Sequence, residues 1–420
     1  MELKAKEPKV RFGEFTGEWE QLLLKDGLVK NSKKNKGLSI SNVESVSNKT
    51  GFTKQTEQFD DYSVASADLS NYYVIAEKQF AYNPSRINVG SIAYKTEGDE
   101  TSVVSPLYVS FFTNEILDDK FLWYWFKTSA FEKQRQRLSE GGVRDTLSFN
   151  QLSQMSLLIS QLEEQKQVGK FLATIDDSLK LHQQELEKLK ESKKTLLSKM
   201  FPKEGADSPE IRFAGFTDPW EQCKFSETFN FPISTNSLSR AMLNYDRGEV
   251  KSIHYGDVLI KYPSILDIRR EEIPFITNGT LEKYKANLLV NGDLIFADAA
   301  EDETVGKAVE IKGITDENIV SGLHTIVARA NQHKAQYFLG YYINSDIYHR
   351  QLLRLMQGSK VSAISKGNLQ KTKVIFPKDI GEQQKIGDFF KKFDTLITLH
   401  HQELENLKAL KKTLLNLMFV

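Results

Sequence analysis

The sequence predicts a mixed α/β (α+β) protein in which two similar globular units alternate with two long helices. The first observation behind this prediction is an internal repeat, because Glu164–Phe201 returns as Glu382–Phe419 with about half of its positions identical. A second repeat opens each half of the chain, since Pro8–Gln21 and Pro209–Gln222 share the pattern R-F-x-x-F-T-x-x-W-E-Q. Between these shared segments the two halves differ almost completely. This pattern indicates one framework that carries two different inserts.

The repeats divide the chain into four blocks. The first globular unit covers residues 1–160 and the first long helix covers residues 161–202. Pro202–Pro209 has the composition of a linker and leads into the second globular unit, which covers residues 203–378. The second long helix covers residues 379–420.

Short apolar runs rich in β-branched residues predict strands inside the globular units. Two of these runs follow a Gly-Asp pair, which is typical of a turn that leads into a strand. The expected strands are Asn71–Ala76, Ser91–Tyr94, Val103–Phe112, Asp257–Tyr262, Asp293–Ala297 and Ser321–Ala328, and the expected helices are Asp119–Arg137 and Lys334–Met356.

Both long helices carry apolar residues at intervals of three and four, as at the a and d positions of a coiled coil. Two matched seams in one chain predict that the helices pair with each other as an antiparallel coiled coil, with a pseudo-two-fold relation between the halves. The histidine and lysine positions of the two seams are also equivalent, and we favour register control over partner docking as their role. The seam residues are Leu172, Ile175, Leu179, His182, Leu186, Leu189, Lys193, Leu196 and Met200 in the first helix, and Phe390, Phe393, Ile397, His400, Leu404, Leu407, Lys411, Leu414 and Met418 in the second.

Composition narrows the class of protein. The chain has 420 residues, with 56 basic and 56 acidic ones, and this neutrality counts against a protein that holds DNA unaided. No apolar run is long enough to cross a bilayer and the N-terminus lacks a signal-peptide core, so we expect no membrane contact and a cytoplasmic location. The single cysteine, Cys223, occupies the place of Leu22 in the first repeat, which predicts a packing role. The seven histidines form no cluster with metal-ligand spacing, so no metal site is expected.

Sequence motifs of catalysis are missing, with one weak exception. The chain has no Pro-Pro-aromatic tetrapeptide, no Gly-rich dinucleotide fingerprint, no Walker A loop and no nucleophile elbow. Asp298 or Asp302, followed by Glu310 and Lys312, resembles the Asp…Glu-x-Lys arrangement of metal-dependent nucleases. A strand with alternating exposed charges explains these residues better. No catalytic residue is therefore predicted.

The repeated helices, with the pattern EQxxI/VGxFLxxxD…LxxxHxxELExLKxxKKxLLxxMF, resemble the specificity subunit of Type I restriction-modification systems (the HsdS family). The paired openings and the divergent inserts support this resemblance, which covers essentially the whole chain. It implies that each globular unit is a target-recognition domain that reads one half of a bipartite, asymmetric double-stranded DNA site, while the helices set the half-site spacing. It also implies two docked modification subunits that bring S-adenosylmethionine and restriction subunits that bring ATP and Mg²⁺. The chain itself would then be non-catalytic and would need no cofactor.

Candidate DNA contacts are polar residues on segments that read as loops, where side chains can reach a groove. In the first unit they are Lys33, Lys34, Asn35, Lys36, Asn83, Ser85, Arg86 and Asn88, with Gly141, Gly142 and Arg144 in the loop that ends the unit. In the second unit they are Tyr262, Thr277, Asn278, Thr280, Lys283, Thr304 and Lys307, with Ser359 and Lys360 in the equivalent end loop.

Two other functions remain open. The chain could be a coiled-coil adaptor whose globular units bind proteins, which neutral charge and paired seams allow. It could also be a single-chain nuclease that uses Glu310 and Lys312. Neither explains why the inserts diverge while their flanks stay alike.

Overall fold

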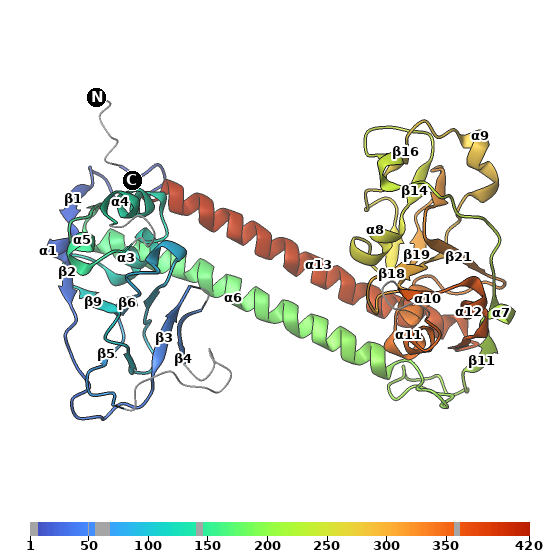
Figure 1. Cartoon of the computed structure of the whole chain (residues 1–420), viewed down its shortest axis with the longest axis horizontal. Helices are drawn as coiled ribbons and strands as arrows, with labels where there is room; N and C mark the ends of the chain where they lie inside the picture. The colour runs from blue at the N-terminus through green and yellow to red at the C-terminus, as the bar shows by residue number, and fades with distance from the viewer. Residues whose placement is uncertain (1–6, 49, 55–67, 140–145, 357–361) are drawn as a thin grey trace. The chain divides into compact units, whose positions relative to one another are not determined.

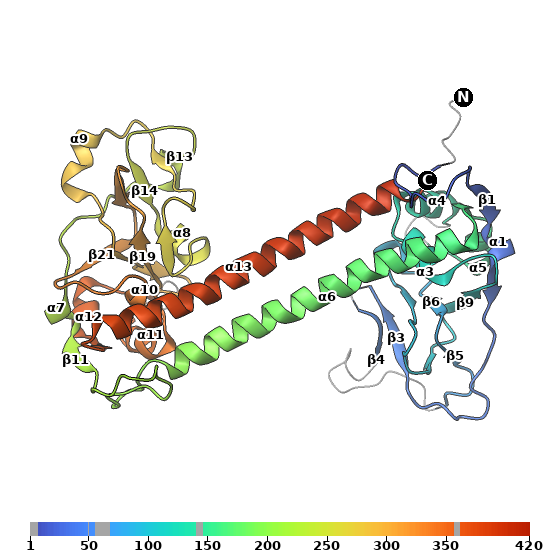
Figure 2. The same ribbon diagram turned by 180° about the vertical axis from the view of Figure 1, so that it is seen from behind.

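The computed structural model describes residues 7–48, 50–54, 68–139, 146–356 and 362–420 of the chain. It divides into two compact units: unit 1 takes in Met1–Gln183 and Gln402–Val420, and unit 2 takes in Gln184–His401. Each long helix therefore contributes one part to each unit. In both units short helices lie beside the long ones, and the strands of the insert extend away from them (Figures 1 and 2). The predicted mixed α/β class is confirmed.

Unit 1 is built on an antiparallel sheet of four strands in the order β2-β9-β6-β7, next to the two-stranded ladders β3–β4 and β5–β8. Phe80 and Phe111 stack across neighbouring strands with ring centroids 5.0 Å apart, and both are fully buried. The elements are β1 (Glu20–Leu23), α1 (Leu24–Gly27), β2 (Leu28–Lys30), β3 (Glu44–Ser47), β4 (Gly51–Lys54), β5 (Tyr73–Ile75), β6 (Gln79–Tyr82), η1 (Ile87–Val89), β7 (Ile92–Tyr94), β8 (Ser102–Val104), β9 (Val109–Thr113), α3 (Asp119–Trp125), α4 (Ser129–Leu138), α5 (Phe149–Ser153) and β10 (Ser156–Ile159).

Unit 2 carries a different pair of sheets, with strand orders β12-β21-β17-β19-β15 and β13-β16-β14-β20. Both are mixed, because β15 pairs with β19 and β14 with β20 in parallel. The elements are β11 (Glu221–Lys224), α7 (Phe225–Thr228), β12 (Phe229–Asn230), η2 (Arg240–Met242), β13 (Leu243–Asn244), β14 (Lys251–Ile253), α8 (Tyr255–Ile260), β15 (Ile265–Asp267), β16 (Phe275–Ile276), α9 (Leu281–Tyr284), η3 (Lys285–Asn287), β17 (Leu294–Ala297), β18 (Ala299–Ala300), β19 (Ala308–Lys312), β20 (Ile319–Ser321), β21 (Thr325–Ala330), α10 (Phe338–Ile343), α11 (Asp346–Leu353), β22 (Ser362–Ala363), α12 (Lys366–Lys371) and β23 (Lys373–Phe376).

The shared segments form the same framework in both units. β1 pairs with β10 in unit 1, and β11 pairs with β23 in unit 2, both antiparallel. Leu22 lies opposite Leu157 in the first ladder, and Cys223 lies opposite Val374 in the second. Cys223 is half-buried against the core and burial raises the pKa of its thiol, as suits a small packing residue.

An ion pair ties each opening segment to a long helix. The Arg11 guanidinium makes two bonds of 2.6 and 2.8 Å to the buried Glu164 carboxylate. Arg212 makes the same fork to the buried Glu382, at 2.7 and 2.8 Å. Such bidentate pairs fix orientation as well as contributing energy. The repeated arginine and glutamate of the sequence are therefore a structural clamp.

Equivalent backbone hydrogen bonds join the opening segment of each half to the end of a long helix. The Val10 amide donates to the Leu417 carbonyl at 3.0 Å in unit 1. The Ile211 amide donates to the Lys199 carbonyl at 3.0 Å in unit 2. The segment that opens each half thus meets the end of a long helix in both units.

Matched hydroxyl side chains begin the short helices. Thr128 caps α4 by accepting from the Phe131 amide, and Ser345 caps α11 by accepting from the Tyr348 amide. Ser148 and Ser365 cap α5 and α12 in the same way. These caps explain why Asp119–Arg137 and Lys334–Met356, each expected as one helix, are each two helices.

The long helices α6 (Leu162–Lys199) and α13 (Ile380–Leu417) run antiparallel within each unit, as predicted. In unit 1 Asp176 pairs with Lys411, and six residues further along α6 the His182 imidazole lies 3.4 Å from Glu403. In unit 2 Glu185 lies 3.7 Å from His400, and Lys193 pairs with Asp394. All the seam residues named above are buried or half-buried. None of the helices in the described part of the chain is both long and apolar enough to span a membrane.

Three strand predictions need correction. Ser321–Ala328 is interrupted by a turn at residues 322–324, so it takes in the end of β20 and most of β21. Asp257–Tyr262 is mostly helix α8, because the His254 side chain accepts from the Gly256 amide and begins a helix where a turn was expected. Val103–Phe112 is interrupted by a turn in which the Tyr108 amide bonds to the Ser105 carbonyl, so it contributes to two separate strands. Apolar runs of this length do not distinguish strand from helix by pattern alone.

Candidate nucleic-acid interface

The lysine-rich segment after β2 divides into exposed and structural residues. Lys33 and Lys36 are exposed. Asn35 is buried, and its side chain bonds the main chain of Ile40 in both directions, at 2.8 and 3.3 Å. The Lys34 ammonium donates to the Asn71 carbonyl at 2.7 Å and lies 3.4 Å from the Tyr73 ring centroid. Asn35 is therefore wrong as a base contact, because it holds the turn together.

The turn after β6 presents three of its four candidates to solvent. Ser85, Arg86 and Asn88 are exposed, while the half-buried Asn83 accepts from the Ser85 amide at 3.0 Å and shapes the turn. Gly90 ends the turn at φ +83°, a conformation that favours glycine.

The end-loop candidates Gly141, Gly142, Arg144, Ser359 and Lys360 lie outside the described residues. Beyond the first of these loops, the Leu147 amide donates to the Pro84 carbonyl at 3.1 Å. This bond places the start of α5 beside the exposed turn after β6. A hollow of about 540 Å³ opens there, lined in part by Lys30, Thr146, Asn150 and Gln154, and none of the described residues that line it is acidic. No sequence pattern marks these polar residues as neighbours.

Two candidates in unit 2 are wrong because they support the core. Tyr262 is 1% exposed, and its hydroxyl donates to the Glu272 carbonyl at 3.1 Å. The Lys307 ammonium donates to the carbonyls of Leu259 and Tyr262 at 2.9 and 3.2 Å and so closes the C-terminal end of α8. Burial lowers the pKa of Lys307.

The remaining unit 2 candidates lie on two exposed segments. Asn278 occupies a left-handed turn at φ +57° and is exposed, as are Thr280 and Lys283 at the start of α9. Thr277 is half-buried and accepts from the Asn244 amide at 3.1 Å. Thr304 is exposed and bonds Asp302 within its own loop, at 2.5 Å between side-chain oxygens.

The nuclease pattern does not assemble into a metal site. Glu310 is buried and accepts from the Tyr337 and Gly340 amides, both at 2.8 Å, at the start of α10. Burial raises its pKa to about 8, against the opposing effect of the Gly340 amide and Lys312. Asp298 faces His324 instead, at 3.2 Å. The carboxylates of Asp298, Asp302 and Glu310 do not come together as a group that could hold an ion.

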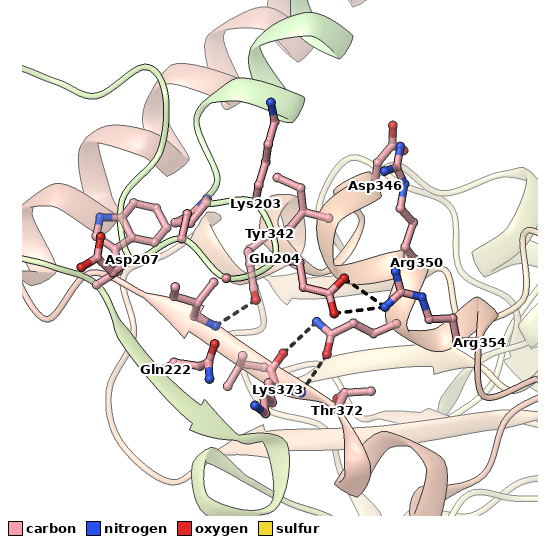
Figure 3. Close-up of a pocket in the computed structure, with 18 of the residues that line it drawn as sticks. Lys203, Glu204, Asp207, Gln222, Tyr342, Asp346, Arg350, Arg354, Thr372 and Lys373 are labelled. Carbon is pink, nitrogen blue, oxygen red and sulfur yellow. Dashed lines mark hydrogen bonds and ion pairs between the residues drawn. The ribbon is translucent and has the colours of Figure 1, made fainter.

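A larger hollow of about 990 Å³ lies in unit 2 where the linker passes α11 and β23 (Figure 3). Glu204 of the linker makes two bonds to Arg354, at 3.0 and 3.1 Å, across this hollow (Figure 3). Gln351 makes a two-way bond to the Lys373 main chain at 2.9 and 3.0 Å. The equivalent Gln134 of unit 1 bonds Ser156 in the same way, at 2.7 and 2.9 Å.

A three-residue contact is repeated at the junction of the short and long helices. In unit 1 the Tyr124 hydroxyl donates to Asp176 at 2.8 Å, and Lys411 pairs with the same carboxylate. In unit 2 Tyr341 donates to Asp394 at 2.6 Å, and Lys193 pairs with that carboxylate. We call these contacts the Tyr–Asp–Lys triads. In each unit the seam lysine of one long helix therefore forms an ion pair with an aspartate of the other long helix.

The sequence profile of the Type I restriction modification DNA specificity domain matches the chain twice, over residues 18–191 and 218–409. The chain is similar to the Type I restriction enzyme MjaVIII specificity subunit of Methanocaldococcus jannaschii, at 23% identity over 83% of this chain and 81% of that one. It is also similar to the putative type I restriction enzyme MjaX specificity subunit of the same organism, at 22% identity over 98% and 95% of the two chains.

Solved structures share the fold. The S subunit of a Type-I restriction-modification system from M. genitalium has a TM-score of 0.57 at 15% identity and covers 99% of both chains. A chain from a structure that describes complex assembly and conformational transition of the type I R-M system has a TM-score of 0.51 at 15% identity, covering 95% of this chain and 96% of that one. With two profile matches that span most of its length, one on each repeat of the framework, the chain belongs to the family of type I restriction-modification DNA specificity subunits.

Proposed function

We propose that the chain reads a two-part double-stranded DNA target, with one half-site read by each globular unit. The observation that carries this proposal is the repeated framework, whose Arg–Glu clamps and Tyr–Asp–Lys triads hold differently built sheets in the two units. A common framework with two different inserts suits a target whose halves differ in sequence. The long helices would then set the spacing between the half-sites.

The partners follow from the same repetition. Two modification subunits can dock in equivalent ways, because each unit offers the same framework contacts. These subunits would bind S-adenosylmethionine and methylate adenine N6, and restriction subunits would bring ATP and Mg²⁺. The chain itself would be non-catalytic, would bind no cofactor and would work in the cytoplasm.

The DNA contacts would come from the exposed candidates. They include Lys33, Lys36, Ser85, Arg86 and Asn88 in unit 1, and Asn278, Thr280, Lys283 and Thr304 in unit 2. Phosphate contacts should outnumber base contacts, as in most protein–DNA interfaces. Because the chain has no net charge, tight binding would need the docked partners to close around the duplex.

Methylation mapping tests this function directly. The chain is co-expressed with its modification subunit in a host without DNA methylation, and the genome is read by single-molecule sequencing. We expect a split motif with N6-methyladenine in both halves, on opposite strands. A folded, stoichiometric complex that leaves no modified motif would refute the proposal and would favour a protein-binding adaptor.

A further inference from the structure

His324 of unit 2 is held in place by main-chain and side-chain contacts together. Its Nδ1 lies 3.2 Å from a carboxylate oxygen of Asp298, and its carbonyl accepts from the Asp298 amide at 3.0 Å. Tyr255, in the first turn of α8, meets the His324 ring edge-on with centroids 5.2 Å apart. The Tyr255 amide lies 3.3 Å from the Leu323 carbonyl, which ties α8 to the same turn.

The backbone at His324 has a conformation that is uncommon for a residue with a side chain. His324 connects β20 to β21 at φ +54°, a conformation that glycine adopts without steric cost. Half of the imidazole, 51%, is exposed. A non-glycine residue kept in this conformation at the surface motivates a search for function.

The contact with Asp298 fixes which imidazole nitrogen can meet a ligand. A carboxylate only accepts, so Nδ1 must carry the proton that bonds Asp298. In the neutral ring Nε2 is then an acceptor, and among the described residues no group bonds it. The Nε2 atom of the His324 ring can therefore accept a hydrogen bond from the exocyclic amino group of a nucleobase.

The neighbourhood of His324 contains the exposed polar segments expected of a reading surface. β18 follows Asp298 and pairs with β22. Thr304 lies on the exposed segment after β18. Beside α8, Arg240 and Lys261 are exposed, although Arg240 forks onto Asp257 and the Lys261 ammonium donates to the Glu272 carbonyl at 2.7 Å. Phosphodiester oxygens carry no proton to donate, so an acceptor nitrogen favours the amino group of a base edge as its ligand.

We propose that His324, positioned by Asp298 and Tyr255, reads one base of the half-site of unit 2. Its Nε2 accepts from the amino group of adenine N6 or cytosine N4 in the major groove. This inference rests on the proposed function and adds to it a residue and the class of base that it reads.

The test is methylation mapping of the full complex with His324→Gly. Glycine fits φ +54°, so the fold should be retained while the imidazole is lost. We expect one position of the unit 2 half-site to become degenerate, with discrimination there reduced at least about fivefold, the lower end for a single base pair. The other positions, the unit 1 half-site and the spacer should stay unchanged. The exposed His333, changed to Ala, is the matched control and should leave the motif intact.

Each other result has a distinct meaning. An unchanged motif with His324→Gly would overturn this inference alone, as would equal loosening by His333→Ala. A uniform loss of methylation with no change of motif would mean that His324 contacts the DNA backbone, which also overturns it. A wild-type complex without any split motif would overturn the proposed function, and this inference with it.

Discussion

Glu310 shows how a residue can look catalytic in sequence and be structural in the fold. Its carboxylate is buried and satisfies two backbone amides at the start of α10. An acceptor in this position compensates donors that would otherwise be buried without a partner. The neighbouring Tyr337, at φ +71°, depends on one of these bonds.

We expect Glu310→Ala to lower the free energy of unfolding by about 2 kcal/mol, because two buried amides lose their acceptor. Chemical denaturation measures this change. The exposed Asp302→Ala is the control and should have little effect. Equal stability of both variants would contradict the structural role of Glu310, and Mg²⁺-dependent DNA cleavage by the purified wild type would reopen the nuclease interpretation.

Lys127 gives unit 1 a stability that depends on pH. Partial desolvation of its ammonium, whose side chain stays 30% exposed, and then the nearby charge of Lys411 lower its pKa from the ordinary value of 10.5 to about 8, while Asp176, 3.7 Å away, opposes this shift. Between these two pH values the unfolded chain holds more protons than the folded one. Stability must therefore rise with pH in this window.

As the pH rises from 8 to 10.5, we expect the free energy of unfolding of the wild type to increase relative to that of Lys127→Met. Parallel thermal melts of the two proteins across this range give the difference. Asn344 occupies the equivalent place in unit 2, and its amide bonds the Ala308 and Gly340 carbonyls, both at 2.7 Å. Asn344→Ala should therefore show no such pH-dependent difference. A constant difference between wild type and Lys127→Met would show that the pKa is not lowered.

At the scale of elements, the Tyr–Asp–Lys triads fix the short helices to the long ones. Both tyrosines are almost fully buried, so their hydroxyls need the carboxylates that they contact. Burial and the neighbouring aspartate raise the pKa of both tyrosines, which keeps the hydroxyl proton in place as a donor.

We expect Tyr124→Phe and Tyr341→Phe each to destabilise its own unit by about 1–2 kcal/mol, since each removes a hydrogen bond to a charged group. Hydrogen exchange read by mass spectrometry should show faster exchange at α3 for the first variant and at α10 for the second. Tyr245→Phe, at an exposed tyrosine, is the control. Faster exchange in both units from one variant would argue against two independent triads.

The sequence predicted the elements whose signals are local. The long helices, their seams and the matched openings follow from periodicity and repetition, which need no knowledge of the fold. The prediction of a strand at Asp257–Tyr262 is wrong because the helix there begins at a cap formed by the His254 side chain. The pattern of apolar residues does not reveal such a cap. Helix breaks at Thr128 and Ser345 were missed for the same reason.

The candidate site was less predictable, because exposure depends on distant residues. Asn35, Tyr262 and Lys307 have the chemistry of DNA contacts, yet each bonds main-chain groups brought near by folding. Conversely, His324 becomes a candidate only through its contacts with Asp298 and Tyr255, which lie far from it in sequence. The type of a residue alone does not show whether it supports the fold or is available to contact DNA.

At the scale of the whole molecule, the long helices belong to both units, so their length should govern the spacing of what the units bind. We expect one added heptad at matched positions of α6 and α13 to lengthen the spacer of the DNA motif by at most about three base pairs. The reason is that seven residues add about 10 Å of helix. Methylation mapping should show both half-sites unchanged. Altered half-sites with a constant spacer would contradict this role.

The paired closures at Val10–Leu417 and Ile211–Lys199 have a consequence for how the gene could be arranged. In unit 2 the linker runs on from Lys199 to Ile211, whereas in unit 1 Val10 meets Leu417 although the two residues lie far apart in sequence. A circular permutant that is opened within Pro202–Pro209 and joined near the Val10–Leu417 closure should exchange the order of the halves and keep both closures, while it would disturb the Glu204–Arg354 contact of the linker.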